Sequence, residues 1–514
     1  MWSLLTWRND DKDQAAAVTL MAGVFLYTLA RAALAPVFHD EAYTYFVYGR
    51  APLPVVLSEL GNNHILNTLF IKCSVWLFGM SELSLRLPAL VGHLFFLTGV
   101  YRALGLFLRK KAFFAGAVLL TLNLFVLELF SAGRGYALGL GFFMQAMYYF
   151  LRSRESRRTE DVRVMFSFLA LAVLSHLSFL FVYVPAFVMG GTDVLFRQGW
   201  SLTRWKRAPG IVFWRGYRFP LLLTGLLFLA LKTPVLVQMK TGGFYHGGGA
   251  GFWPDTVRSL GEASFYNQVV LPERCWFLAY AGLTAGAVLI GAFLTSRRMK
   301  GTVEVPGGEK MLTGMYALLL GSAGVMAACH HALGVKYIIG RMAVFLIPLF
   351  WLTVTLFWAC LFHSGGRVRQ LCLNWAAGIA VAVAVALFLS GMNFKKYTIA
   401  PDDYLSRDII RLLQAARQEG VWGGRNVTLG THFVFVPSLY FYSRKNHLTW
   451  LEVVDLTNTD SGPVSCDAYY IFEPRTRGIL RYDVGRDFDK IEPASTRVLA
   501  RYPSPGTVLA FSSP

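Results

Sequence analysis

The sequence predicts a polytopic α-helical membrane protein with about eleven transmembrane helices, followed by a small α+β domain. Hydrophobic residues make up 55% of the 514 residues and charged residues only 15%, whereas soluble proteins are nearer about 25% charged. The mean hydropathy is +0.46. Aromatic residues reach 15%, as expected where ring side chains lie at the depth of lipid headgroups. Together these values exclude a chain of ordinary soluble domains.

Apolar runs long enough to cross a bilayer, which takes about 20 residues, recur along the first 391 residues. The run 164–196 is too long for one helix, and a break at Ser175-His176 would make it a tight helical hairpin. Nine further spans are predicted near 15–36, 84–108, 112–130, 136–151, 218–237, 275–296, 311–330, 342–363 and 371–391. The first is expected to be a retained helix rather than a signal peptide, because no small-residue cleavage site follows it.

The net charge of +19 is a topology signal. From Phe394 onward the chain has 15 Lys/Arg and 13 Asp/Glu, so the tail is close to neutral. The excess positive charge therefore lies in short loops between the apolar runs and does not form a nucleic-acid patch. With eleven spans and a cytoplasmic N-terminus, five basic clusters fall on the cytoplasmic side, as the positive-inside rule expects: 109–111, 152–163, 197–218, 297–310 and 367–369. The outer segments are then 37–83, 131–135, 238–274, 331–341 and the tail.

The run 65–80 is apolar enough to be a span, but counting it as one would invert every later loop. We therefore expect a helix that lies at the outer surface. The tail is expected to be a separate extracytoplasmic domain, which divides the chain into a transmembrane domain (1–393) and an α+β domain (394–514). Its predicted elements are an amphipathic helix over 402–418 and short apolar runs at 426–431, 433–442, 466–472, 479–484 and 507–511.

The first outer loop opens with His39-Asp40-Glu41-Ala42-Tyr43, directly after the first span. Two adjacent carboxylates at a membrane boundary are costly unless they are solvated or used. A carboxylate there could act as a base toward an acceptor hydroxyl or amine. The alternative is a solvated loop pair without a catalytic role.

The same loop continues with Gly61-Asn62-Asn63-His64, beside the 65–80 helix. Amides and an imidazole form a hydrogen-bonding surface suited to sugar hydroxyls, and His246 in the outer loop 238–274 is a further candidate for substrate binding. Alternatively, Asn62 or Asn63 could cap the helix that follows.

Cations in the outer segments form a third group. Arg134 lies in the tight loop before Tyr136, and Lys336 and Arg341 lie in the last outer hairpin. A guanidinium binds phosphate bidentately, which makes a lipid phosphate a natural partner. The alternative is snorkelling to headgroups, which we favour for Lys336.

A metal or cofactor is not indicated. The six Cys form no CxxC pair, so neither a disulfide framework nor a zinc site is expected. Adjacent histidines at His330-His331 project differently, and His176 is interpreted as a structural histidine. A divalent metal remains possible.

Three segments together resemble the GT-C superfamily of polyprenyl-phosphate-sugar-dependent glycosyltransferases, in the branch of protein O-mannosyltransferase relatives and lipid A aminoarabinose transferases. They are the Asp40-Glu41 pair, the stretch from Asn63 through Leu85-Arg86-Leu87-Pro88, and the entry to the late span from Arg341 to Pro348. Gly133, Ile65 and Met342 stand where many relatives carry an acid, Pro and Tyr. The missing acid leaves Asp40 as the candidate base.

The resemblance implies a bacterial inner-membrane enzyme that uses a polyprenyl phosphate such as undecaprenyl phosphate as sugar carrier. The sugar would pass with inversion to a lipid, glycan or protein acceptor at the outer face. Asp40 would be the general base, Glu41 an orienting or binding group, and Arg134, Arg341 and Lys336 would contact the lipid phosphate. His39, Tyr43, Asn62, Asn63, His64, Tyr136 and His246 would line the substrate site. The alternatives are a lipid-linked-sugar transporter and a glycan polymerase or ligase.

Overall fold

The computed structural model describes residues 12–60, 63–156, 158–197, 209–240, 247–266, 272–300, 308–363, 367–401, 403–457, 466–472, 496–502 and 507–512. Its contacts divide the chain into two compact units. The first unit comprises residues 1–29, 53–67 and 87–392, and the second comprises residues 30–52, 68–86 and 393–514.

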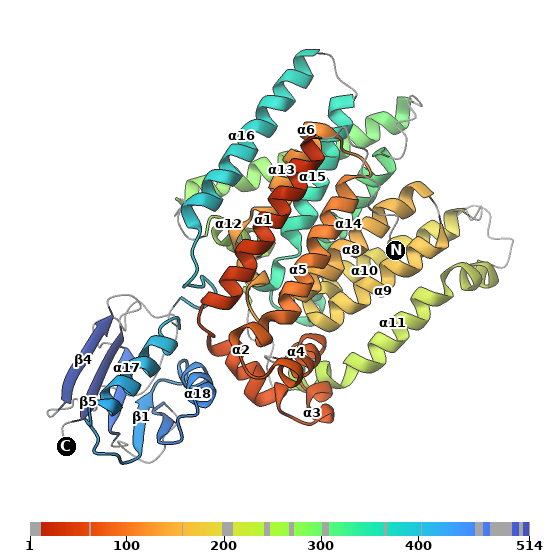
Figure 1. The fold of residues 1–514 in the computed structure, drawn as a ribbon. Coiled ribbons are helices and arrows are strands. Elements are labelled where there is room, and N and C mark those ends of the chain that lie inside the picture. Colours follow the sequence, from red (N-terminus) through yellow and green to blue (C-terminus); the bar gives the residue numbers. More distant parts are fainter. Residues whose placement is uncertain are drawn as a thin grey trace. The chain divides into compact units, whose positions relative to one another are not determined.

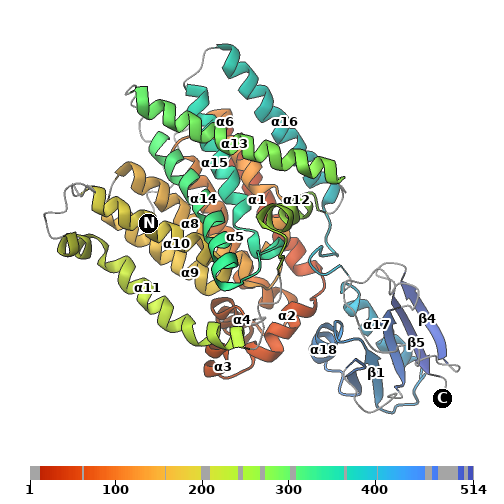
Figure 2. The same ribbon diagram turned by 180° about the vertical axis from the view of Figure 1, so that it is seen from behind.

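The first unit is helical, and α8, α9 and α10 lie side by side in both views (Figures 1 and 2). Its long helices, two of which extend into the second unit, are α1 (Lys12–Leu34), α5 (Glu82–Leu104), α6 (Lys110–Thr121), α8 (Gly135–Ser156), α9 (Thr159–Ser175), α10 (Leu180–Arg197), α11 (Pro209–Lys240), α13 (Glu273–Lys300), α14 (Gly308–Leu333), α15 (Leu346–His363) and α16 (Arg367–Gly391). The shorter elements are α3 (Leu53–Ser58), α7 (Leu124–Phe130), η3 (Leu177–Phe179), η4 (Phe252–Val257), α12 (Arg258–Ser264) and η5 (Gly340–Ala343).

Seven described helices are long and apolar enough to cross a membrane, or eight if one bent pair counts as a single span. The chain is therefore a multi-pass membrane protein, and the number of eleven spans stays a prediction. The hairpin break at Ser175-His176 is confirmed, because α9 ends at Ser175 and His176 is extended. A helix is also present within 65–80, where α4 (Ile65–Phe78) has 14 residues, or about 21 Å, less than the hydrocarbon core of about 30 Å.

The predicted span over 112–130 is bent in the structure. The segment forms α6 and α7, which are bent by 65° relative to each other. Asn123 is the cause, since its side chain caps α7 by accepting a hydrogen bond from the Val126 amide at 3.1 Å.

The second unit contains a five-stranded sheet with the strand order β2-β1-β3-β5-β4. β1 (Val427–Thr431) pairs in parallel with β2 (Leu451–Asp455) and β3 (Ala468–Phe472), while β5 (Thr507–Ser512) is antiparallel to β3 and to β4 (Thr496–Tyr502). The helices α17 (Ser406–Gln418) and α18 (Val436–Lys445) accompany this sheet (Figure 1).

The apolar runs of the tail match these elements in part. The amphipathic helix is confirmed as α17. The runs 426–431 and 466–472 contain β1 and β3, and the run 507–511 covers all but the last residue of β5. The run 433–442 instead contributes most of α18, which has a proline in its first turn and buries Leu439 and Tyr442 on one face. The run 479–484 lies outside the described residues.

The core of the second unit also includes residues from the segment 37–85, which follows α1 and runs into α5. Val37, Ala42, Ile71 and Leu85 belong to the same buried cluster as the apolar faces of α17, α18 and the sheet. The segments that contain α2 (His39–Tyr43), η2 (Thr44–Gly49) and most of α4 therefore fold with residues 393–514. The predicted boundary at 393–394 falls at one edge of this unit, but the unit also includes 30–52 and 68–86.

Candidate active site

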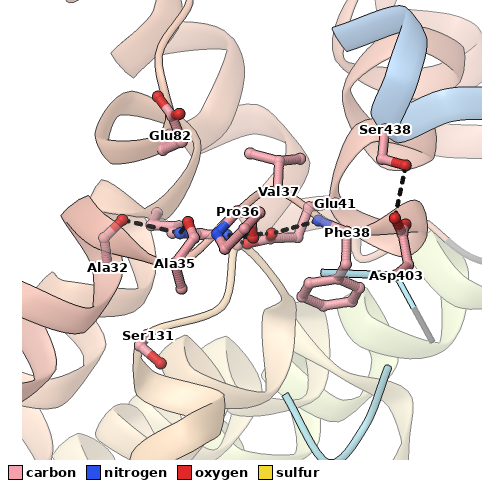
Figure 3. Close-up of polar contacts among 12 residues, drawn as sticks. Ala32, Ala35, Pro36, Val37, Phe38, Glu41, Glu82, Ser131, Asp403 and Ser438 are labelled. Carbon is pink, nitrogen blue, oxygen red and sulfur yellow. Dashed lines mark hydrogen bonds and ion pairs between the residues drawn. The ribbon is translucent and has the colours of Figure 1, made fainter. Parts of the chain in front are cut away.

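The turn that carries the paired carboxylates belongs to the second unit. Pro36 follows the end of α1, and the short helix α2 begins at His39 after an extended Phe38. The Phe38 amide donates to Glu41 Oε2 at 3.2 Å, so this side chain closes the first turn of its own helix. Figure 3 shows the Glu41 carboxylate directed toward Phe38.

Glu41 is fully engaged by a buried arginine. Arg86 Nε donates to Glu41 Oε1 at 2.7 Å, and Arg86 Nη2 donates to Glu41 Oε2 at 2.6 Å. The remaining N–H groups of Arg86 donate to the carbonyl oxygens of Ala32, Ala35 and Pro36 at 2.7–2.9 Å. The guanidinium therefore caps the C-terminal end of α1 and fixes the α2 turn, which satisfies carbonyls that the helix end leaves without intrahelical partners.

Asp40 differs from its neighbour in exposure. Its side chain is partly exposed, whereas Glu41 is 1% exposed. His39 stacks on Tyr43, with ring centroids 5.7 Å apart, and both rings are partly exposed. The turn thus presents a carboxylate and two rings at its surface, above a buried ion pair.

Residues from the tail complete the turn, and sequence analysis did not identify them. Asp403 is buried and accepts a hydrogen bond from the His39 amide at 2.6 Å. The Nδ1 atom of His39 lies 3.0 Å from the carbonyl oxygen of Val434. No local pattern marks Asp403, because its partner His39 is 364 positions away.

A second polar group lies in the first unit, around the loop that carries Arg134. Arg134 is 1% exposed, and Asn67 Nδ2 donates to the carbonyl oxygen of Gly133 at 3.3 Å. A Cβ atom at Gly135 would overlap the carbonyl oxygen of Ser175 and lie 2.7 Å from His64 Cβ. Glycine is therefore required where α8 begins, because this end of the helix contacts His64 directly.

Three rings gather at that contact. The ring centroid of His64 is 5.2 Å from that of Tyr136 and 4.8 Å from that of His176, and the Tyr136 and His176 centroids are 4.3 Å apart. Burial, followed by the charges of Arg134 and Arg341, lowers the pKa of His176 to about 3. The same causes, with His176 in addition, hold the pKa of His64 well below its ordinary value. Both imidazoles are therefore neutral at physiological pH.

The tautomers of these histidines follow from their contacts. The Ser178 amide donates to His176 Nδ1 at 3.2 Å, which places the His176 proton on Nε2. The Nε2 atom of His64 is buried and has no hydrogen-bond partner among the described residues. A buried polar atom of this kind is one that a polar ligand would satisfy.

Arg341 joins this group from the segment that leads into α15. Its guanidinium carbon lies 5.9 Å from the centroid of Tyr136. Gly340, which has a φ of +50°, precedes it, and its amide donates to Ser259 Oγ at 2.9 Å. Thr256 Oγ1 donates to the carbonyl oxygen of Ile338 at 2.7 Å. The loop 247–266 therefore holds the chain that leads into Arg341, while Lys336 is exposed.

Of the amides expected near the start of α4, the structure describes Asn63. Asn63 is buried, and its Nδ2 donates to the carbonyl oxygens of Val56 and Glu59 at 2.7 and 2.8 Å. Asn63 thus holds the turn that precedes α4. Asn62 and His246 lie outside the described residues.

The structure also reveals an acid close to Arg134 in sequence. Glu128 in α7 is 1% exposed and accepts a hydrogen bond from the hydroxyl of Tyr266. An ionisable residue inside an apolar run is a functional candidate, and this signal was available in the run 112–130. Within the described ranges, no three His, Cys, Asp or Glu side chains are placed to hold a metal ion.

An apolar groove of about 800 Å³ runs along α13 in the first unit. Its lining includes Trp253, Phe277, Tyr280 and Val288. Trp253 belongs to the same loop whose Thr256 holds the Arg341 hairpin. The lining of the groove thus includes a residue of the loop that positions the cation.

The predicted site residues thus form two groups. His39, Asp40, Glu41 and Tyr43 belong to the second unit, and Asn63, His64, Arg134, Tyr136, Lys336 and Arg341 belong to the first. Each group is assembled by contacts within its own unit.

No family model matches this chain, and no curated protein matches it. Among solved structures, it is similar to ArnT from Cupriavidus metallidurans in a crystal structure bound to undecaprenyl phosphate, with 14% identity and a TM-score of 0.45. The apo crystal structure of the same protein gives 13% identity and a TM-score of 0.45. In both cases the match covers 96% of this chain and 98% of that chain. A likeness of this extent does not assign a function, which rests on the residues described above.

Proposed function

We propose that this chain is a membrane glycosyltransferase of the GT-C type, which transfers a sugar from a polyprenyl-phosphate donor to an acceptor at the outer face of the membrane. The observation that carries the proposal is the division of roles between two adjacent carboxylates. Glu41 is neutralised by Arg86 in a buried ion pair, whereas Asp40 is partly exposed at the surface of the same turn. One carboxylate thus holds the turn and its neighbour is presented for chemistry.

In the proposed reaction Asp40 accepts the proton of the acceptor hydroxyl or amine as that group attacks the anomeric carbon. The bond between the anomeric carbon and the phosphate oxygen breaks, and the configuration inverts. The polyprenyl phosphate leaves with the electron pair. Glu41 acts as a positioning residue, because Arg86 occupies both of its oxygens.

The second polar group supports binding of the donor phosphate. Arg134 and Arg341 supply guanidinium groups, which match phosphate geometry. The neutral imidazole of His64 adds a buried Nε2 that a phosphate oxygen would satisfy once this atom carries the proton. Preorganised donors of this kind stabilise charge that develops on a leaving group. The apolar groove whose lining includes Trp253 suits the polyprenyl chain.

The test is sugar transfer by the purified protein from an undecaprenyl-phosphate-linked sugar, comparing wild type with Asp40→Asn. The variant keeps the shape of the side chain and removes the proton-accepting charge, so transfer should fall by a factor of ~10²–10⁴. Binding of the carrier phosphate should be unchanged. Transfer at the wild-type rate by the variant would remove Asp40 from the mechanism.

The same assay separates the rival functions. A transporter would move the lipid-linked sugar across a vesicle membrane without forming a new glycosidic bond. A polymerase or ligase would form one, but with a whole glycan as the transferred group. Mass spectrometry of envelope glycans from cells with and without the protein identifies the transferred group and the acceptor.

A further inference from the structure

The C-terminal sheet has three neighbouring parallel strands, and α/β domains commonly bind ligands at the carboxyl ends of such strands. β1 lies between β2 and β3, and all three strands are parallel. The chain passes from β1 through α18 to β2 and then returns to the other side of β1 as β3. In open parallel sheets, ligand sites lie outside the carboxyl ends of the strands, where the direction of the connections reverses. The segment 432–434 follows β1 at this position.

The turn that carries Asp40 contacts this segment. His39 Nδ1 lies 3.0 Å from the carbonyl oxygen of Val434, and the His39 ring meets Phe433 edge to face with centroids 6.2 Å apart. The backbone amide of Val37 donates to the hydroxyl of Tyr442 in α18 at 2.8 Å. A segment of the first outer loop is therefore bound where a soluble α/β domain would bind its ligand.

Asp403 is the centre of this contact. Its Oδ2 accepts from the His39 amide at 2.6 Å, and its Oδ1 accepts from Ser406 Oγ at 2.7 Å and Ser438 Oγ at 2.9 Å. The two serine hydroxyls are 2.8 Å apart, and all three side chains are at most 2% exposed. Figure 3 shows Asp403 and Ser438 directed toward each other. The carboxylate is held by both helices of the sheet domain and holds the residue before Asp40.

Both sequence neighbours of Asp40 are thus held by buried ionisable side chains. Asp403 binds His39 on one side, and Arg86 binds Glu41 on the other. With its neighbours fixed, the backbone of Asp40 has little freedom to move. A displacement of about 1 Å of a reacting group costs about 100-fold in rate, so this constraint matters for a base.

We infer that Asp403 is a positioning residue for the base Asp40, and that the C-terminal sheet domain is therefore part of the catalytic apparatus. This inference rests on the proposed function. It predicts that the domain acts on the chemical step and not on donor binding.

The test compares Asp403→Ala, Asp403→Asn and Asp467→Ala in the purified full-length protein. The asparagine oxygen can still accept from the His39 amide, and its NH2 group can donate to the serines. Asp467 is the matched control, because it accepts from the Thr428 amide and hydroxyl at 2.9 and 3.0 Å within the same sheet. Ser438→Ala is a milder variant for the case in which Asp403→Ala does not fold.

We expect Asp403→Ala to lower kcat about 100-fold, with the affinity for short-chain undecaprenyl phosphate unchanged. Asp403→Asn should restore most of the rate, and Ser438→Ala should show a smaller loss of kcat. Hydrogen exchange of the segment 37–43 should accelerate in Asp403→Ala and not in Asp467→Ala. Wild-type kcat in folded Asp403→Ala, or equal losses in Asp403→Ala and Asp467→Ala, would overturn the inference.

The two proposals fail in different ways. Full activity of Asp40→Asn would remove the proposed base, although the exchange measurement would still report whether Asp403 holds the turn. Loss of transfer in Asp40→Asn together with wild-type kcat in Asp403→Ala would leave the proposed function intact and reject the positioning role alone.

Discussion

Arg86 and Glu41 form an ion pair in which both side chains are 0% exposed and the Nη2–Oε2 distance is 2.6 Å. Removing one partner of such a pair leaves a buried charge uncompensated, which costs about 3–5 kcal/mol. We therefore expect Glu41→Gln to lower the thermal unfolding midpoint in detergent, although it is as conservative as Asp40→Asn. Asp40→Asn is the matched control and should unfold as the wild type does. Equal midpoints for the two variants would contradict the structural role of Glu41.

Arg341 should bind the donor phosphate specifically. Losing a charge-assisted hydrogen bond costs about 1.5–3 kcal/mol, so Arg341→Ala should weaken binding of a short-chain polyprenyl phosphate by roughly 10- to 150-fold. Arg341→Lys should recover only part of the lost affinity, because an ammonium group lacks the planar, two-pronged donor geometry of a guanidinium. The measurement is a titration of all three proteins in one detergent. If lysine serves as well as arginine, Arg341 contacts headgroups and not the donor.

Gly135 should tolerate no side chain. A Cβ atom there would lie 2.7 Å from His64 Cβ and overlap the Ser175 carbonyl, so Gly135→Ala must displace the ring cluster. Such overpacking costs typically about 1–3 kcal/mol, and we expect lower stability together with weaker phosphate binding. Gly286→Ala is the control, because nothing lies within 4 Å of a Cβ atom at that helical position. If Gly135→Ala binds the phosphate as tightly as the wild type, the rings of His64, Tyr136 and His176 are not part of the phosphate-binding site.

The stability of the second unit should depend on pH through Asp403. Burial raises the pKa of Asp403 from 3.8 to about 7, and the nearby charge of Glu41 also raises it. The hydrogen bonds from Ser406, Ser438 and His39 lower this pKa, but by less. Between these pH values the folded protein retains a proton that the unfolded chain has lost. The contribution of Asp403 is therefore largest below pH 4 and is lost as the pH rises toward 7.

His432 affects stability in the opposite direction over part of this pH range. Burial lowers its pKa from 6.5 to about 4, so the unfolded chain binds a proton that the folded protein does not, and stability increases as the pH rises between these values. The difference between wild type and Asp403→Asn isolates the aspartate. The unfolding midpoint of Asp403→Asn should rise relative to wild type between pH 5 and pH 7.5, whereas Asp467→Asn should follow the wild type. If the unfolding midpoints of wild type and Asp403→Asn change in parallel with pH, Asp403 does not cause the pH dependence of stability.

The orientation in the membrane is tested by labelling single cysteines in a cysteine-free background with a membrane-impermeant reagent. The distribution of basic loops predicts that Ser58 and Ala415 face outward and that Glu160 faces the cytoplasm. Ala415 and Glu160 are exposed, and Ser58 is partly exposed, so all three sites are open to the reagent. Intact spheroplasts should be labelled at positions 58 and 415 and protected at 160. The reverse pattern would invert the predicted topology.

Several features of this protein could be predicted because they depend on local pattern. Composition and hydropathy predicted the helical membrane architecture, and the Ser175-His176 pair marked the end of α9. The spacing of Ile409, Ile410 and Leu413 predicted α17, since an amphipathic helix shows its buried face in its sequence. The same local reasoning identified His64, Arg134, Tyr136 and Arg341, which the first unit brings together.

Only the tertiary structure showed which contacts distinguish the two acids, to which the family resemblance had given different roles. Asp40 and Glu41 are adjacent and equivalent in sequence, and they differ because Arg86, 45 positions away, binds one of them. Asp403 reaches His39 over 364 positions, and Val37 and Ala42 share a core with the distant sheet. Hydrophobic burial and hydrogen bonding depend on proximity in space, which sequence spacing does not record for distant segments. A local pattern therefore identifies what a residue could do, and long-range packing determines which of two like residues does it.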